Sequence, residues 1–426
     1  MHAVLRKYLA FLARLLIKKH KPYVIGVTGT VGKTTTTHNI ATLFCTAFGE
    51  NAVEISKYNY NGEFGFPLSI IGEKTGGKNL FLWMKVAYTA MIRYFRPYPR
   101  YLILEYGIDH PGEMDFLLSI ATPDIAIVTP IEPNHIEQFQ KFENYRKEKL
   151  KILAYAKKAV VHESLAENVP VDTPLYGFSC QESMQVQDMK ISEKGTTAFV
   201  KIDEIIYEIY YPSVGFFLIE NLLSLLYIAH KMHIDKEKIQ ESMKSMKVRK
   251  GRGKLLKGIN NSLIIDGSYN GGYLSIKTGL ESLVDFFETK NIVLVLGDMR
   301  ELGPEEEKLH LQLADDIIRI FQDCPSVQVF LVGPMMRKYV FPKIADILPT
   351  KSALSSREIG EYVKSYSDEI SEKEVFYVKG SQNTIFLEEA IKMWISEDDF
   401  KNLPRQDEKW LAIKNEFFES VEKGIL

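Results

Sequence analysis

Hydrophobic runs of strand length alternate along the chain with stretches that have the spacing of amphipathic helices. The strand-like runs are YVIGVT, YLILEYG, DIAIVTP and AVVH in the first half, then SLIIDGS, IVLVLGD, VQVFLVG and EVFYVKG in the second. This alternation predicts an α/β protein with a parallel sheet in each half, because parallel strands need helical crossovers. Between the halves, TTAFVKI and IIYEIYYP alternate with a period of two, which predicts a hairpin at the side of the first domain.

The domain boundary is expected in MKVRKGRGKLLKG, residues 246–258. This segment is basic and contains glycine, and it falls after the strands of one sheet and before those of the next. A length of 426 residues is enough for two or three domains. The sequence therefore predicts a helix over residues 1–21, a central α/β domain over residues 22–248 and a Rossmann-like domain over residues 249–426.

Two segments have the pattern of amphipathic helices with cations. The first, at the N-terminus, is interrupted by Arg6, Lys7 and Arg14, so it does not resemble a signal peptide. The second spans residues 79–100 and mixes aromatic with basic residues. Packing on the protein's own core is the favoured interpretation of both, and docking on a membrane surface or on a partner protein is the alternative. Apolar positions of the first are Val4, Leu5, Tyr8, Leu9, Leu12, Leu15 and Leu16, and Lys18, Lys19 and Lys21 follow at the end where a helix dipole favours cations.

Composition narrows the classes of function. A net charge of -2 gives no overall attraction to nucleic acid. The three cysteines, Cys45, Cys180 and Cys324, lie far apart, so we expect neither a disulfide framework nor a cysteine metal site, and a reducing cytoplasm fits. No apolar run is long enough to cross a membrane.

The stretch VIGVTGTVGKTTTT carries the clearest chemical signal. The general phosphate-loop pattern has a glycine six positions before its lysine, where this chain has Val27. The remaining glycines, lysine and threonine still direct backbone N–H groups, a helix N-terminus and an ammonium toward polyphosphate, and Thr34 would hold magnesium. The alternative is an ordinary strand-turn-helix. The residues expected to bind nucleotide here are Gly29, Thr30, Gly32, Lys33, Thr34 and Thr35.

Three further groups follow strands in the first half. Glu105 ends YLILE, His135 comes just after IVTPIEPN, and Lys149 lies on the next helical stretch. Open parallel sheets bind ligands at the carboxyl ends of their strands, so these groups are expected to converge on the phosphate loop. Each also has a plain interpretation: Glu105 as a loop cap, His135 as a surface histidine and Lys149 as a solvated lysine.

These motifs together resemble the Mur ligase family, the ATP-dependent amide ligases of peptidoglycan precursor synthesis. The resemblance runs from about residue 22 to residue 392, and its D-alanyl-D-alanine-adding (MurF) type is the nearest. GTVGKTT is similar to the family's own phosphate loop, which lacks the first glycine. The other segments that carry the resemblance are YNYNGEFGFPLSI with Asn59, Asn61, Gly65 and Pro67, then LEYGIDHPGEM, VLGDMRELGPEE and YVKGSQNTIFLEE.

The resemblance implies roles for particular residues. Lys33 and Thr34 match phosphate and magnesium contacts, Glu105 and His135 match magnesium ligands, and Lys149 matches a lysine that the family carbamylates to ligate a second metal. The implied cofactors are ATP and two Mg²⁺ ions. The implied substrates are a precursor-peptide or small-molecule carboxylate and an amino acid or dipeptide amine, joined through an acyl phosphate. The implied nucleotide contacts in the rest of the chain are Asn221, Arg252, Asp266 and Asn270.

The sequence also departs from the family pattern. GFFLIEN has Phe217 and Leu218 where the family has histidine and asparagine, DGSYNGGY has Gly267 for an aspartate, and Gln382 stands where arginine is usual. We expect no counterpart of the family's N-terminal UDP-sugar-binding domain. A ligase for another acid and amine, a phosphate-loop kinase or switch, and a degenerate scaffold remain open alternatives. A cytoplasmic protein, peripheral at the inner membrane face if the N-terminal helix docks there, fits all of them.

Overall fold

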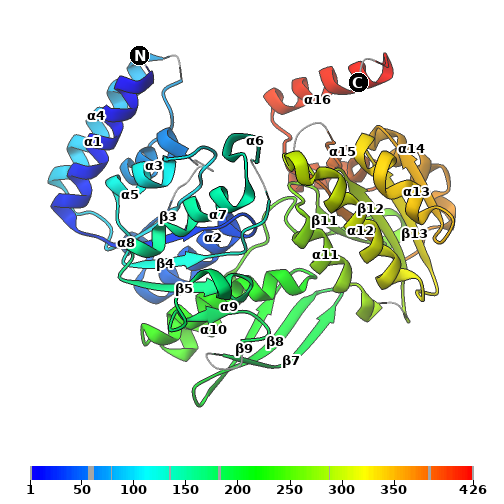
Figure 1. The fold of residues 1–426 in the computed structure, drawn as a ribbon, viewed down its shortest axis with the longest axis horizontal. Helices are drawn as coiled ribbons and strands as arrows, with labels where there is room; N and C mark the ends of the chain where they lie inside the picture. The colour runs from blue at the N-terminus through cyan, green and yellow to red at the C-terminus, as the bar shows by residue number, and fades with distance from the viewer. Residues whose placement is uncertain are drawn as a thin grey trace. The chain divides into compact units, whose positions relative to one another are not determined.

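A computed structural model describes residues 2–55, 62–77, 79–133, 136–180, 184–286, 288–381 and 385–424 (Figure 1). The chain forms two compact units. The first comprises Met1–Asp188, Ala198–Ile209 and Ile219–Met246, and the second comprises Met189–Thr197, Tyr210–Leu218 and Lys247–Leu426.

The first unit is built on a six-stranded parallel sheet in the order β2-β3-β1-β4-β5-β6. Its four central strands are the four runs expected from the sequence, and the two edge strands are only two and three residues long. The strands are β1 (Tyr23–Thr28), β2 (Val53–Ile55), β3 (Tyr101–Glu105), β4 (Ile125–Val128), β5 (Lys158–His162) and β6 (Leu175–Tyr176).

Helices cover both faces of this sheet. Alternate residues of β1, β3 and β4 join one core with residues of α1, α3, α4, α5 and α8, while α2 packs on β1, β2 and β3. The helices of this unit are α1 (His2–His20), α2 (Lys33–Phe48), α3 (Gly62–Ile71), α4 (Leu80–Phe95), α5 (Glu113–Ile120), α6 (Ile136–Phe139), α7 (Phe142–Leu150), α8 (Ile152–Tyr155), α9 (Phe216–Lys231) and α10 (Lys236–Ser245).

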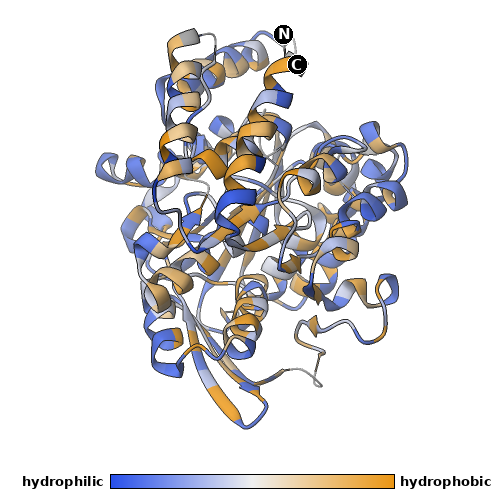
Figure 2. Ribbon diagram, turned by 90° about the vertical axis from the view of Figure 1, so that its left-hand side faces the viewer, coloured by the Kyte–Doolittle hydropathy of each residue, from blue (hydrophilic) through white to orange (hydrophobic). Residues whose placement is uncertain are grey.

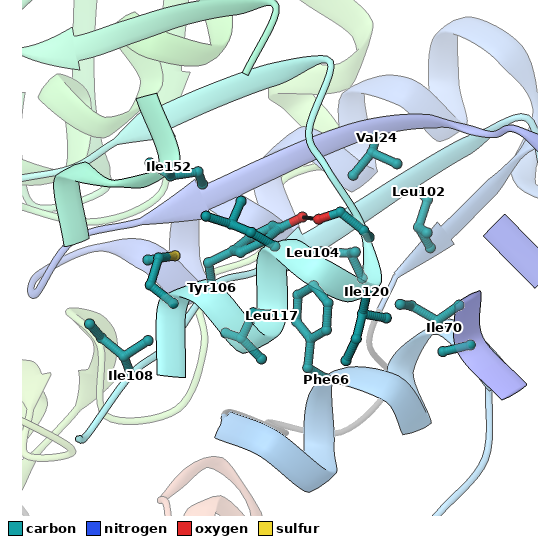
Figure 3. Close-up of a cluster of buried hydrophobic side chains, with 14 of the residues drawn as sticks. Val24, Phe66, Ile70, Leu102, Leu104, Tyr106, Ile108, Leu117, Ile120 and Ile152 are labelled. Atoms are coloured by element: carbon teal, nitrogen blue, oxygen red, sulfur yellow. Dashed lines mark hydrogen bonds between the residues drawn. The ribbon is translucent and has the colours of Figure 1, made fainter. Parts of the chain in front are cut away.

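Tyr106 lies at the centre of the core between the sheet and α5 (Figure 3). Its ring packs on Phe66, with centroids 4.8 Å apart, and its hydroxyl donates a hydrogen bond of 2.7 Å to the Ala121 carbonyl. A Cβ at Gly26 would lie only 2.7 Å from this ring, so the central strand β1 needs glycine there. Close packing therefore fixes β1, which leads directly into the phosphate loop.

A three-stranded sheet, β7-β8-β9, follows the first sheet in sequence. The two runs expected to form a hairpin are β8 (Gly195–Ile202) and β9 (Ile205–Tyr211), and β7 (Gln185–Ser192) adds a third strand that the sequence analysis did not predict. β7 has a mostly exposed polar pattern, which gives little periodic signal.

The second unit contains the sheet β10-β11-β15-β12-β13-β14. The four strands expected from the sequence are all present and parallel, but β10 runs antiparallel to β11, so the expectation of an entirely parallel sheet is wrong at this edge. A short antiparallel connection suffices because β10 and β11 are joined by a turn rather than a crossover helix. The strands are β10 (Lys254–Lys257), β11 (Leu263–Gly267), β12 (Asn291–Gly297), β13 (Val327–Val332), β14 (Thr350–Ala353) and β15 (Glu374–Lys379).

Helices also cover both faces of the second sheet, and the two faces have separate hydrophobic cores. The mixed α/β fold with parallel sheets predicted from the sequence is confirmed. Among the described residues, no helix combines the length and apolar character that a bilayer crossing needs. The helices are α11 (Tyr273–Glu281), α12 (Glu306–Phe321), α13 (Phe341–Ile344), α14 (Ser356–Ser365), α15 (Glu388–Lys392) and α16 (Glu408–Glu422).

Candidate phosphate-binding and catalytic site

The loop between β1 and α2 is fastened to the segment that follows β4. The backbone N–H groups of Thr30 and Val31 both donate to the Pro130 carbonyl, at 2.8 and 3.3 Å. The Thr30 hydroxyl donates to the Glu132 carbonyl at 3.2 Å and accepts from the Glu132 N–H at 3.1 Å. These hydrogen bonds hold the loop in one shape.

Two glycines in the loop are required by its geometry. Gly29 and Gly32 have φ of +136° and +87°, which side chains rarely adopt. A Cβ at Gly29 would lie 2.0 Å from the Thr129 hydroxyl oxygen, and one at Gly32 would lie 2.4 Å from the Asn221 side-chain oxygen. Glycine is therefore the only residue type that fits at these two positions, where the sequence also predicts phosphate binding.

α2 begins at Lys33, and Gly32 at its N-cap provides no side chain to cap it. Uncapped N–H groups at a helix N-terminus attract anions. The Lys33 ammonium donates to the Thr30 carbonyl at 3.1 Å, which holds it over the loop. Thr34 is half-buried in the first turn, and Thr35 is buried behind it. The arrangement can bind a polyphosphate.

Glu105 ends β3, beside the central strand that leads into the loop. It pairs in register with Val27 of β1. The side chain is buried, and its Oε1 has no hydrogen-bond partner in the part of the chain that the structure describes. A buried carboxylate oxygen without a donor is costly unless a cation occupies it. The geometry therefore supports a cation-binding role rather than the loop cap considered above.

Lys149 is almost fully buried, with 1% of its surface exposed. Its ammonium lies 4.6 Å from the centre of the Tyr145 ring. Burial holds the pKa of Lys149 well below its usual value, and the nearby charge of Lys33 lowers it further. The carboxylates of Asp109, Glu105 and Glu113 act in the opposite direction and raise it. The interpretation of Lys149 as a solvated lysine is wrong, because α7 turns this side chain inward.

The neighbouring Glu148 has a different partner. It accepts from the N–H groups of Gly112 and Met114 at the start of α5, at 2.9 and 3.2 Å, and forms an ion pair of 2.9 Å with Lys151. These contacts stabilise the N-terminus of α5, where a negative charge is favoured. Glu148 thus fixes α7 against α5.

Asn221 is brought to the same loop from α9. It is buried, and its Oδ1 accepts a hydrogen bond of 3.4 Å from the Thr36 hydroxyl. Asn221 is the residue of GFFLIEN that the family pattern retains, and it packs directly against Gly32. Its contact with the loop fits the nucleotide-contacting role that the resemblance implies.

The other three expected nucleotide contacts lie in the second unit. Asp266 is buried at the end of β11 and accepts hydrogen bonds from the Gly251 N–H at 3.1 Å and the Ser268 hydroxyl at 2.6 Å. Burial raises the pKa of Asp266 to about 6. The Arg252 guanidinium lies 4.7 Å from the Tyr269 ring centre, and the Asn270 carbonyl accepts from the Lys379 ammonium at 3.0 Å. All three lie in or next to the loop after β11.

Several residues that were expected to contribute lie outside the described residues. These are His135, Asn59 and Asn61, and Gln382, the departure from the family pattern, lies outside them as well. Among the residues that are described, no group of three or more histidine, cysteine, aspartate or glutamate side chains is arranged as a metal site.

The structure adds residues that the sequence analysis did not select. Glu132 and Tyr145 both contact Thr30, the latter through hydroxyls 3.3 Å apart. Glu132 follows β4 by a few residues, and its place at a strand end is a signal that the sequence contained. In the second unit, Arg405 donates to the Ser268 carbonyl at 2.9 Å and forms a buried ion pair with Glu388. No motif in the sequence pointed to Arg405.

The comparisons with known proteins agree with this geometry. Residues 27–229 match the family described as the Mur ligase middle domain. A curated UDP-N-acetylmuramoyl-tripeptide–D-alanyl-D-alanine ligase from Bacillus subtilis (strain 168) is 28% identical over 73% of this chain. The match covers 64% of that relative, so this chain spans less than two thirds of its length.

Solved structures show the same fold. MurF from Acinetobacter baumannii superposes with a TM-score of 0.73 at 18% identity, covering 91% of this chain and 80% of that one. MurF from Thermotoga maritima in complex with ADP superposes with a TM-score of 0.70 at 22% identity, covering 91% and 83%.

Proposed function

Because residues 27–229 match the Mur ligase middle domain, we propose that this chain is an ATP-dependent ligase that forms a carbon–nitrogen bond through an acyl phosphate. The acid is a peptide carboxylate on a peptidoglycan precursor, and the amine is D-alanyl-D-alanine or a similar dipeptide, as the name of the Bacillus relative suggests.

The observation that supports this proposal is that the buried Lys149 interacts electrostatically with Lys33, at the phosphate loop, and with Glu105, at the end of β3. Lys33 and Glu105 are close enough to Lys149 to move its pKa, and the loop that holds Lys33 is fixed by Pro130. A phosphate loop alone would serve many reactions. A buried lysine and a buried carboxylate beside it supply the additional charged groups that joining an anionic acid to a triphosphate requires.

In the first step, a carboxylate oxygen of the acid attacks the γ-phosphorus of ATP. The new O–P bond forms as the bond to the β-phosphate oxygen breaks and ADP leaves. Lys33 and the N–H groups at the start of α2 lie where they can balance the negative charge that accumulates. In the second step, the amine attacks the acyl carbon, the C–O bond to phosphate breaks, and the nitrogen loses a proton.

Magnesium fits part of this donor set. Glu105 offers a buried carboxylate oxygen without a hydrogen bond and Thr34 a hydroxyl, which are the oxygen ligands that Mg²⁺ combines with phosphate and water. His135 joins them in the proposal through the resemblance. Magnesium bound there would neutralise phosphate charge. We propose two such ions, with Lys149 carbamylated: its neutral amine adds to carbon dioxide and loses a proton, which replaces a buried amine with an anionic ligand.

Contacts to the nucleotide are proposed for Asn221 in the first unit and for Arg252, Asp266 and Asn270 in the second. The resemblance supports these contacts, together with the place of Asn221 beside Gly32 within the first unit and of the other three at the loop after β11 within the second. A cytoplasmic location belongs to the same proposal, because ATP and the precursor of such a ligase are found there.

The test is release of inorganic phosphate from ATP, measured across a panel of acids and amines. A ligase releases phosphate fully only when both the acid and the amine are present, and the amide appears in equal amount by mass spectrometry. A stable phosphorylated acceptor without amide would indicate a kinase. Absence of nucleotide binding by calorimetry would indicate a degenerate scaffold, and both results would overturn the proposal.

A further inference from the structure

α1 has apolar residues on two different faces. Leu9, Ala10, Ala13 and Leu16 are buried in the core of the first unit. On another face, Val4 is 73% exposed, and Tyr8 and Phe11 are exposed at the following turns, at i, i+4 and i+7. A surface helix that only packed on its own core would bury one stripe and expose polar residues on the rest. The second apolar stripe of α1 is therefore not explained by the fold.

α4 repeats this arrangement. Val86 and Ala90 are buried, whereas Phe81 and Phe95, at its two ends, are 77% and 80% exposed. Met84, Tyr88 and Met91 are also exposed and lie between these phenylalanines at helical spacing.

The two helices lie side by side at one edge of the first unit (Figure 1). A groove of about 590 Å³ runs between them and is lined by Tyr8, Leu12, Tyr88, Met91 and Phe95 among others. Figure 2 faces the side on which the pair lies, and hydrophobic residues are visible along it. The exposed stripes and the groove form one surface, which we call the helix-pair surface.

The charges of these helices all have one sign. Neither α1 nor α4 contains an aspartate or glutamate, although the chain as a whole has a net charge of -2. Lys7 is exposed beside the first stripe, and Lys18, Lys19 and Lys21 are exposed at the C-terminal end of α1. Arg96 follows α4 and is exposed as well. Apolar residues are thus accompanied by a local excess of positive charge.

We propose that the helix-pair surface docks this protein on an anionic membrane, with the exposed aromatic and aliphatic side chains entering the interface between headgroups and acyl chains. Amphipathic helices that lie in a membrane plane combine aromatic or leucine side chains with lysine and arginine. Each lysine or arginine near an anionic surface strengthens such binding about fivefold.

A second copy of this chain fits the surface less well than a bilayer. Two copies meeting through α1 and α4 would bring cations together without a carboxylate on either helix to balance them. Interface cores between proteins are depleted in lysine, whereas membrane-docking helices are enriched in it. Charge complementarity therefore favours an anionic lipid surface as the occupant.

Co-sedimentation of the full chain with vesicles tests the proposal. Vesicles of phosphatidylcholine alone are compared with vesicles that contain roughly 30 to 40% phosphatidylglycerol. Each comparison is made at low and at high salt. We expect binding to the anionic vesicles, weakened by salt because surface charges are screened. The double variant Phe81→Ser/Phe95→Ser should lose binding, and Lys18→Glu/Lys19→Glu should weaken it by about tenfold or more.

Matched controls separate this surface from general stickiness and from the proposed ligase reaction. Ile347→Ser removes an exposed apolar residue elsewhere, and Lys364→Glu/Lys373→Glu reverses two exposed lysines of the second unit. Both controls should bind vesicles as wild type does. All variants should keep wild-type melting temperatures and phosphate release from ATP, since none of these residues lies at the phosphate loop.

Three results would overturn the proposal. One is equal binding to neutral and anionic vesicles, or none to either. Another is full binding by both helix-pair variants. The third is a stable dimer in analytical ultracentrifugation that Phe81→Ser/Phe95→Ser disperses, because a second copy would then occupy the surface.

Discussion

Gly32 lies so close to Asn221 that a Cβ built on the glycine would come within 2.4 Å of the asparagine side-chain oxygen. A side chain from α9, a helix far along the chain, therefore packs against the N-cap residue of α2 without capping its N–H groups. Asn221 thus leaves no room for a side chain at position 32 of the phosphate loop.

Gly32→Ala should consequently damage both stability and nucleotide binding. A non-glycine residue with this left-handed backbone costs about 1 to 2 kcal/mol, and the overlap with Asn221 adds about 1 to 3 kcal/mol. Gly112→Ala is the matched control, because Gly112 is also the left-handed N-cap of a helix, with φ of 84°, but has nothing within 4 Å. Urea unfolding and ATP titration calorimetry would measure both variants. Equal destabilisation of the Gly32→Ala and Gly112→Ala variants would show that the Asn221 side chain moves aside at no cost in stability.

How far the sequence predicts the fold depends on the length and burial of each strand. β1, β3, β4 and β5 were predicted because their apolar runs are buried on both faces. β2, β6 and β14 were not, since strands of two to four residues at a sheet edge leave no periodic pattern. β10 contains two lysines and was assigned to the basic boundary segment instead.

The site shows a similar limit. The position of Glu105 followed from its place at the end of a strand. The burial of Lys149 did not, because FENYRKEKL is charged all around and its pattern does not show which face turns inward. That orientation is set by tertiary contacts, chiefly those of Glu148 with the N-terminus of α5 and of Lys149 with the Tyr145 ring.

Lys33→Ala should abolish ligation while leaving the fold intact. Removing an ammonium beside a transferring phosphoryl group costs about 3 to 4 kcal/mol or more of transition-state stabilisation, a rate loss of at least ~10²-fold. ATP-dependent amide formation measures the loss, and the melting temperature reports the fold. Near-wild-type turnover by a folded variant would contradict the assignment of the phosphate loop.

Lys149→Ala should lose most ligase activity and regain part of it with added acetate, which can occupy the vacated anionic position. Lys147→Ala is the control on the same helix, because Lys147 is exposed while Lys149 is buried, and it should behave as wild type. A carbamate can be detected independently by carbon-13 NMR after equilibration with labelled bicarbonate. The resonance should disappear in Lys149→Ala and persist in Lys147→Ala. A wild-type protein without it, or a fully active Lys149→Ala, would exclude the carbamate.

Arg405→Met should strongly destabilise the second unit. Arg405 and Lys414 both form ion pairs with Glu388, and all three side chains are at most 2% exposed. Removing Arg405 leaves the buried Glu388 carboxylate with only one of its two cationic partners. Breaking a buried ion pair in this way typically costs about 3 to 5 kcal/mol of folding free energy. Lys308→Ala removes an exposed ion pair with Glu305 and should cost about 1 kcal/mol or less. Guanidinium unfolding measures both, and a similar small loss for each variant would mean that Glu388 gains water when Arg405 is removed.

The last prediction concerns pH. His310 is buried on α12, where its Nε2 accepts from the Met299 N–H at 3.2 Å and its Nδ1 lies 2.7 Å from the Glu306 carbonyl, to which it donates. Both ring nitrogens are thus used in the neutral form. Burial lowers the pKa of His310, against a smaller raising effect of the Glu306 hydrogen bond.

A histidine whose pKa is lower in the folded than in the unfolded state stabilises the fold above the unfolded pKa of about 6.5, and this stabilisation is lost as pH falls below it. The unfolded chain then binds a proton that the folded chain excludes. His310→Gln keeps an acceptor and a donor without a titrating group, so its free energy of unfolding should fall less than that of wild type between pH 7 and pH 5, roughly. Taking the difference between the two curves removes the contribution of the other histidines. Parallel curves would show that the pKa of His310 is the same in the folded and unfolded states, so that protonating Nε2 and breaking the Met299 hydrogen bond costs the fold nothing.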